Sequence, residues 1–311
     1  MESKGLIKIN LDGRPLEKLI QVVSKGIGTL YRPRKIRREA DAQAYAIKVL
    51  KKASTEAEAE AAIIEADTAS LIIQRLEGKE VRRQENIDTV VELASQNLEG
   101  KTVSDEPVDV DWATRFFDIV QDVSKEEMKV LWAKILAKEI ERPSSFSLRT
   151  LELLRTVSSE EAELFMRLSR FVLKQESCFV FIEKGDMSKF GLSYNDLARL
   201  REAGFLQTGE LVQRTYHSNN TETQQSIIIY GHKVLVLSIP PNTKNIVFPI
   251  SILTRAGCEI YELIEHDDDM GYMKDLAIFI KKINPSATVQ YGSLLEIKGD
   301  QVRYSIPLIL L

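Results

Sequence analysis

Residues 34–50 read RKIRREADAQAYAIKVL, and residues 57–76 read AEAEAAIIEADTASLIIQRL. Both stretches lack glycine and proline, and together they are rich in Ala, Glu, Lys and Arg, which have a high helix propensity. In each stretch an apolar or small side chain recurs every three or four residues, which is the spacing of one face of an α-helix. We therefore predict a long N-terminal helical hairpin or stalk over residues 34–100, with an interruption at Gly78.

The repeating face of this helix predicts self-association. A long helix with a continuous face of apolar and small residues is typical of helices that pair between chains, and its alanines let a second helix approach closely. We therefore expect a homo-oligomer. The residues predicted to pair between copies are Ile36, Ala40, Ala44, Ile47, Leu50, Ala57, Ala61, Ile64 and Leu71.

A basic cluster lies at the start of the predicted stalk. Positive charge at a helix N-terminus opposes the helix dipole, which suggests that the cluster has a partner. Two interpretations stay open: a solvated face that pairs with acidic residues of a neighbouring helix or chain, or an anion-binding patch for nucleic acid or a lipid surface. The candidate anion-binding residues are Arg32, Arg34, Lys35, Arg37 and Arg38.

The N-terminal segment, residues 1–33, contains a predicted short amphipathic helix over Leu16–Tyr31. The two glycines of Gly26-Ile27-Gly28 end it, because each lowers the helix propensity by about 1 kcal/mol. Pro33 suits the first turn of the helix that follows. The apolar face of the short helix is predicted to consist of Leu16, Leu19, Ile20 and Val23.

After a linker at residues 99–110, residues 111–174 are expected to form a central helical bundle. Trp112, Phe116, Phe117 and Val120 follow helical spacing, so they indicate a core face rather than a cofactor site. Serines followed three residues later by glutamate predict capping boxes that begin two of these helices. The capping pairs are Ser124 with Glu127 and Ser158 with Glu161, and Ser145 or Ser147 is expected to cap the helix between them.

Residues 175–311 change to an α+β pattern, and the whole chain is assigned to the α+β class. Ser188–Leu206 resembles the helical part of a winged helix, with a helix from Ser193 that Gly204 ends. Further helices are expected after Thr254 and over Met270–Ile283. Short runs of β-branched residues between turns predict strands at residues 178–182, 226–230, 233–239, 245–248, 288–291, 294–297 and 302–306.

Composition excludes several classes of protein. The 311 residues carry 42 Lys and Arg against 46 Asp and Glu, a net charge of −4, so the chain lacks the overall basic charge of many nucleic-acid-binding proteins. The sequence has no uncharged apolar run long enough to predict a membrane span, and no secretory signal is visible. We therefore expect the protein to reside in a bacterial-type cytoplasm. Cys178 and Cys258 lie far apart in the sequence and are expected to be reduced thiols, with at least one buried.

No motif predicts catalysis, a cofactor or a small-molecule substrate. The sequence contains no phosphate-binding loop, nucleophile elbow or zinc-protease motif. The histidines are His217, His232 and His266, and only His266, followed by Asp267-Asp268-Asp269, suggests a metal site. Because runs of acids beside a turn are usually solvated, we expect no bound metal and no cofactor, and any catalytic residues stay unknown.

Several motifs together resemble a bacterial domain-of-unknown-function family of the two-eight-zero-six type. They are the run from Gly26 to Ala40, Arg83-Gln84-Glu85-Asn86-Ile87, Asp111-Trp112, Glu126-Glu127-Met128, Leu131 to Ala137, Pro143 to Thr150 and Leu253 to Glu259. The resemblance covers most of the chain to about Phe171 and is patchier beyond it. The helical block is also loosely similar to alpha-type abortive-infection proteins, which implies a role in anti-phage defence.

These observations lead to one functional hypothesis and two alternatives. The first is a non-enzymatic, self-associating cytoplasmic protein that is a sensor or effector in phage defence. The second is a nucleic-acid-binding regulator that uses the basic cluster and the winged helix, although that helix offers only Arg199 and Arg201 to phosphate. The third is a membrane-surface module in which the helix at Leu16–Tyr31 enters the lipid and the arginines meet anionic headgroups.

Overall fold

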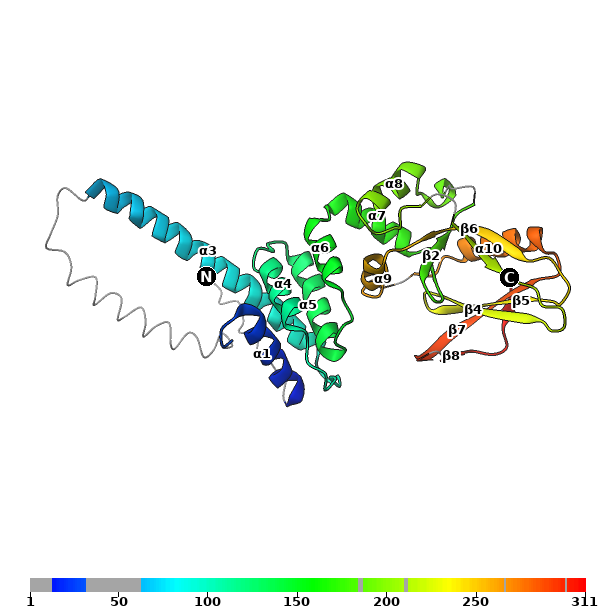
Figure 1. Ribbon diagram of the computed structural model, residues 1–311, viewed down its shortest axis with the longest axis horizontal. Helices are drawn as coiled ribbons and strands as arrows, with labels where there is room; N and C mark the ends of the chain where they lie inside the picture. Colours follow the sequence, from blue (N-terminus) through cyan, green and yellow to red (C-terminus); the bar gives the residue numbers. More distant parts are fainter. Residues whose placement is uncertain (1–12, 32–62, 184–186, 210–211, 266, 300) are drawn as a thin grey trace, which may run out of the picture. The chain divides into compact units, whose positions relative to one another are not determined.

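The computed structural model describes residues 13–31, 63–183, 187–209, 212–265, 267–299 and 301–311 (Figure 1). The chain forms two compact units that divide between Leu151 and Glu152. The first unit is helical, and the second combines helices with an antiparallel sheet. The expected mixture of helices and strands is therefore confirmed. The finer boundaries predicted at residues 33, 100 and 174 remain predictions.

The N-terminal unit packs the helices α1 (Arg14–Ile27), α3 (Ile63–Asn97), α4 (Val110–Val120) and α5 (Glu126–Glu141). Helix α3 packs chiefly on α5, and α1 packs chiefly on α4. The predicted aromatic face of α4 is confirmed as core. Phe116 lies 5.0 Å from the stacked ring of Trp112 and 5.5 Å from the edge-on ring of Trp132.

Helix α1 confirms the short amphipathic helix and corrects its face. Gly28 ends the helix in the left-handed conformation, with φ of 71°. The buried face of α1 is Leu19, Val22, Val23 and Gly26, whereas Leu16 and Ile20 are only half-buried. The buried face is rotated from the predicted one because α4 contacts α1 at Gly26, where the lack of a side chain lets the two helix backbones approach.

Two predicted helix boundaries in this unit are wrong. Helix α3 continues through Gly78, because a single glycine costs about 1 kcal/mol, which a 35-residue helix packed over its C-terminal part can tolerate. Helix α5 begins after Lys125, and Ser124 makes no capping bond. Instead, the carboxylates of Glu126 and Glu127 lie in the first turn, where they stabilise the positive end of the helix dipole.

The C-terminal unit contains the helices α7 (Ser159–Ser169), α8 (Tyr194–Glu202), α9 (Arg255–Tyr261) and α10 (Met270–Ile283), and the short 3-10 helix η2 (Ser188–Phe190). Helix α6 (Leu148–Thr156) precedes them and spans the division between the units. The predicted capping box of Ser158 with Glu161 is confirmed, as is Ser147 as the cap of α6. The predicted bounds of α10 are also confirmed.

The described part of the sheet has nine strands in the order β3-β6-β2-β1-β4-β5-β7-β8, with β9 paired to β7. Neighbouring strands are antiparallel. The strands are β1 (Val172–Lys174), β2 (Cys178–Phe181), β3 (Val212–Tyr216), β4 (Gln224–Tyr230), β5 (Lys233–Ile239), β6 (Ile246–Ile252), β7 (Thr288–Lys298), β8 (Gln301–Tyr304) and β9 (Ile309–Leu310).

The two strands predicted on either side of Gly292 are one strand, β7. A Cβ on Gly292 would lie only 2.8 Å from the carbonyl oxygen of Ser305, so the glycine marks a close approach of two chain segments rather than a break. Strands β1, β3 and β9 were not predicted, because they are short or lack a strong alternation of polar and apolar residues.

Tyr272 of α10 anchors that helix to the sheet. Its ring is fully buried, and its hydroxyl accepts a hydrogen bond from the backbone N–H of Phe181 at 2.6 Å. The same hydroxyl lies 3.3 Å from the carbonyl oxygen of Phe181, to which it donates. Burial raises the pKa of Tyr272 well above its ordinary value, so the hydroxyl keeps its proton.

Candidate functional site

Most residues predicted to bind anions or to pair between copies lie outside the described residues. This holds for all five members of the basic cluster, Arg32, Arg34, Lys35, Arg37 and Arg38, and for every predicted pairing residue up to Ala61. Ile64 lies in α3, but its side chain is not described. Leu71 is described, and its side chain is 66% exposed. The structure thus leaves both predicted sites as predictions.

The chain that leads into the basic cluster is fixed at Tyr31. The Tyr31 side chain is buried, and its hydroxyl donates a hydrogen bond of 3.2 Å to the carboxylate of Asp88 in α3. The backbone N–H of Tyr31 donates to the hydroxyl of Ser24 at 2.9 Å. Tyr31, the last described residue before the basic cluster, is therefore held against α3.

The motif Arg83-Gln84-Glu85-Asn86-Ile87 attaches α3 to the end of α4. The Arg83 guanidinium donates to both carboxylate oxygens of Asp122, at 2.9 and 3.1 Å. This bond with Asp122 raises the pKa of Arg83. The Asn86 amide donates to the carbonyl oxygen of Gln121 at 2.8 Å. The sequence linked this motif only to the family resemblance, but in the structure it holds α3 against the end of α4.

From Leu71 to Arg82, every side chain of α3 that the structure describes is exposed. Burial begins at Ile87, where α3 enters the helical core (Figure 1, cyan). Three large apolar side chains lie in the exposed part: Leu71 is 66% exposed, Leu76 52% and Val81 59%. The described part of the chain leaves these three apolar side chains uncovered.

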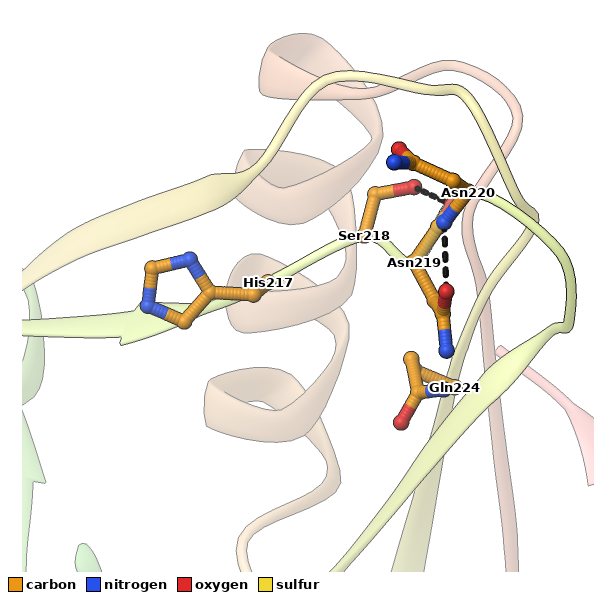
Figure 2. A pocket seen from close by; sticks show the side chains of 5 residues that line it. All are labelled: His217, Ser218, Asn219, Asn220 and Gln224. Carbon is orange, nitrogen blue, oxygen red and sulfur yellow. Dashed lines mark hydrogen bonds between the residues drawn. The ribbon is translucent and has the colours of Figure 1, made fainter.

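A polar pocket of about 360 Å³ opens at the loop between β3 and β4 (Figure 2). The side chain of Asn219 shapes this loop. Its Oδ1 accepts hydrogen bonds from the backbone N–H groups of Asn220 and Thr221, at 2.5 and 3.2 Å. Figure 2 shows the His217 ring pointing away from the other labelled side chains. No nucleophile and base meet among the lining residues, which are His217, Ser218, Asn219, Asn220 and Gln224.

The acidic run after His266 has structural tasks as well. His266 itself lies outside the described residues. The Asp268 carboxylate accepts from the N–H of His232 at 3.0 Å and pairs with Lys233 at 3.3 Å. The Asp269 carboxylate caps α10 by accepting from the N–H of Tyr272 at 3.1 Å. Within the described ranges, no group of three or more His, Cys, Asp or Glu side chains could hold a metal ion.

The fold brings the two cysteines together, which the sequence did not predict. Both are free thiols; Cys178 is buried and Cys258 is half-buried. The two thiols are close enough for each to shift the pKa of the other. Their separation in the sequence gave no sign of this contact, because it forms only when α9 packs against β2.

These features define the class first: a mixed α/β protein with a helical unit, an exposed long helix and an antiparallel-sheet unit. A family model described as "Protein of unknown function (DUF2806)" matches residues 71–277, which is more than half of the chain. The chain belongs to this family, as its motifs predicted. The match starts after the run from Gly26 to Ala40 and extends well beyond Phe171. No curated protein and no solved structure matches the chain.

In the described part of the chain, we find no helix that is both long enough and apolar enough to cross a membrane.

Proposed function

We propose that this protein is a non-enzymatic, self-associating protein in which α3 packs against helices of other copies. One observation carries the proposal: the part of α3 before Ile87 exposes Leu71, Leu76 and Val81. Most of the stability of a helix in a protein comes from packing of its apolar side chains, so packing against a partner would stabilise this part of α3. The apolar surface of these side chains would leave water in the same step.

The spacing of these residues favours a bundle of several helices over a simple pair. Leu71, Leu76 and Val81 are each five residues apart, and at about 100° per residue they point in directions about 140° apart around the helix. The predicted stripe that ends at Leu71 would continue to Arg75 and Gly78, which offer little apolar surface. A helix with apolar side chains on all sides requires cover on more than one side.

Sedimentation of the full chain tests this proposal. We expect the wild type to associate with rising concentration up to tens of micromolar. The variant Leu71→Glu with Leu76→Glu and Val81→Glu should dissociate at concentrations at least about tenfold higher than the wild type does. Circular dichroism should show that both fold alike.

A control variant separates the apolar contacts from the added charge. Gln74→Glu with Lys79→Gln and Arg82→Gln changes exposed positions of the same segment and lowers the net charge by the same amount. It should associate like the wild type. A monomeric wild type at tens of micromolar, or equal weakening by both variants, would refute the proposal.

The alternative nucleic-acid-binding function would use Arg32, Arg34, Lys35, Arg37 and Arg38. Its support is the sequence pattern alone, since these five residues lie outside the described ranges. The winged-helix-like arrangement of η2 and α8 adds little, because Arg199 of α8 already pairs with Glu160 at 2.7 Å. Retention on DNA or RNA that falls with salt, and that is lost when the last four cations become Ala, would favour this alternative.

The alternative membrane-surface function receives less support. It needs the apolar face of α1 to enter lipid, but Leu19, Val22 and Val23 are buried, and α1 packs on α4. Flotation with vesicles, with and without anionic lipid, tests it.

We extend the first proposal to a role as sensor or effector in bacterial anti-phage defence. Its support is the loose similarity of the helical block to alpha-type abortive-infection proteins. A plaque assay in cells that express the protein provides the test. Protection by the wild type and its loss in the Leu71, Leu76 and Val81 variant would support the role, whereas equal plaque counts with and without the protein would refute it.

A further inference from the structure

Four side chains meet where α9 packs against the β1–β2 hairpin. Lys174 of β1 is the direct cross-strand partner of Cys178 in β2, so both side chains lie on the same face of the sheet. Cys258 lies on α9, and Glu262, which caps the C-terminus of α9, lies one helical turn further along the same face, because its N–H donates to the carbonyl oxygen of Cys258 at 3.2 Å. The Lys174 ammonium and the Glu262 carboxylate form an ion pair that joins the two faces.

The ion pair places the two sulfurs opposite each other. Cys178 lies beside Lys174 and Cys258 lies one turn before Glu262, so the thiols face each other across the same junction. The backbone supports this arrangement, because the N–H of Leu253, just before α9, donates to the carbonyl oxygen of Cys178 at 2.9 Å. Leu253 lies five residues before Cys258, so this backbone bond holds the start of α9 against β2.

The two thiols differ in reactivity. The hydrogen bond from Cys178, together with its backbone N–H and the nearby Lys174, lowers the pKa of Cys258 although burial opposes this. The same sulfur–sulfur bond and burial raise the pKa of Cys178. Because the thiolate is the nucleophile, Cys258 is the more reactive thiol. It is also the more accessible one, since Cys178 is only 3% exposed.

We propose that Cys178 and Cys258 form a dithiol site that a hydroperoxide oxidises to a disulfide within one chain. The Cys258 thiol loses its proton, and the thiolate attacks one peroxide oxygen. The O–O bond breaks, the sulfur becomes a sulfenic acid, and the departing hydroxide takes up the thiol proton to form one water. The Cys178 sulfur then attacks the sulfenic sulfur. The S–O bond breaks, the hydroxyl group leaves as a second water with the Cys178 proton, and the S–S bond forms.

The balance of this reaction is complete. Two thiols and one hydrogen peroxide give one disulfide and two waters, so the sulfurs lose two electrons and the peroxide gains two. The bond would tie α9 to β2 across the junction that the ion pair of Lys174 and Glu262 already holds.

Hydrogen peroxide added to the reduced full chain tests this site. We expect the mass to fall by about 2 Da, for two lost hydrogens, and peptide mapping to find Cys178 joined to Cys258. The reaction should run at least about tenfold faster in the folded chain than in concentrated urea, where the thiols are no longer held together.

Two variants test the assigned roles. With Cys178→Ser, the sulfenic acid on Cys258 has no thiol to react with, so dimedone should label Cys258. With Cys258→Ser, Cys178 should resist both peroxide and dimedone. The wild-type measurement stands even if a variant misfolds. Two thiols that remain titratable, a disulfide that joins two chains, or equal rates in buffer and urea would overturn the proposal.

Discussion

Gly26 is the position where a single methyl group should most clearly disturb the helical unit. It lies on the buried face of α1, at the contact with α4. A Cβ built there would overlap the ring of Phe117 and would lie 2.8 Å from the carbonyl oxygen of Ala113. Ordinary contacts of a Cβ are 3.4 Å or longer, and a backbone carbonyl cannot rotate away. Gly26→Ala must therefore push α1 away from α4.

The expected net effect is a loss of about 2 kcal/mol. Overpacking of a well-packed core costs about 1–3 kcal/mol, and the rigid backbone contact favours the upper end of that range. Alanine has the better helix propensity, which returns about 1 kcal/mol. With a urea dependence of about 2 kcal/mol per molar, the unfolding midpoint should fall by about 1 M.

Tryptophan fluorescence during urea unfolding is the assay. The two tryptophans of the chain, Trp112 and Trp132, are both buried in the helical unit, so their signal reports that unit. Gly78→Ala is the control, because it makes the same change inside a helix where a Cβ would meet nothing within 4 Å. That midpoint should stay or rise. A Gly26→Ala midpoint as high as that of Gly78→Ala would refute the close contact of α1 and α4.

Two further predictions concern carboxylates. Glu139→Ala should lower the free energy of unfolding by about 3 kcal/mol, because the N–H groups of Ser144 and Phe146, now 2.7 and 3.0 Å from the carboxylate, lose their acceptor. The same fluorescence assay measures the loss, and an unchanged urea midpoint would contradict this. The hydrogen bond from the Ser158 N–H lowers the pKa of Glu161. At pH values at and below 4.5 the unfolded chain therefore binds more protons than the folded chain, and the stability falls as the pH falls. In thermal melts of the full chain followed by circular dichroism, the melting temperature of Glu161→Gln should fall less steeply with falling pH than that of the wild type. An equally steep fall would count against this prediction.

Local sequence signals predicted much of the C-terminal unit. Ser193 begins α8 with a capping box to Asp196, and Gly204 follows its end with a φ of 88°. The hairpin of β4 and β5 turns at Gly231-His232, as the spacing predicted. Such signals are reliable because the atoms that interact lie within four residues of one another.

The prediction failed where a local signal competed with distant contacts. Ser124 had the composition of a cap but makes no capping bond at the start of α5. Residues 288–291 and 294–297 were predicted as two strands, but they belong to one strand, in which the missing side chain of Gly292 admits the chain near Ser305. For the candidate site, the basic cluster remains a prediction because its residues lie outside the described ranges.

The sequence by itself predicted most helices, most strands and the family, since periodicity, caps and turns act between near neighbours along the chain, but it placed a break at Gly78 inside α3. Only the tertiary structure decided which face of α1 is covered, where α3 becomes exposed, and that Cys178 meets Cys258. These three outcomes depend on contacts between residues far apart in the sequence. Such contacts form when packing removes apolar surface from water, and no local pattern records which partner each surface will meet.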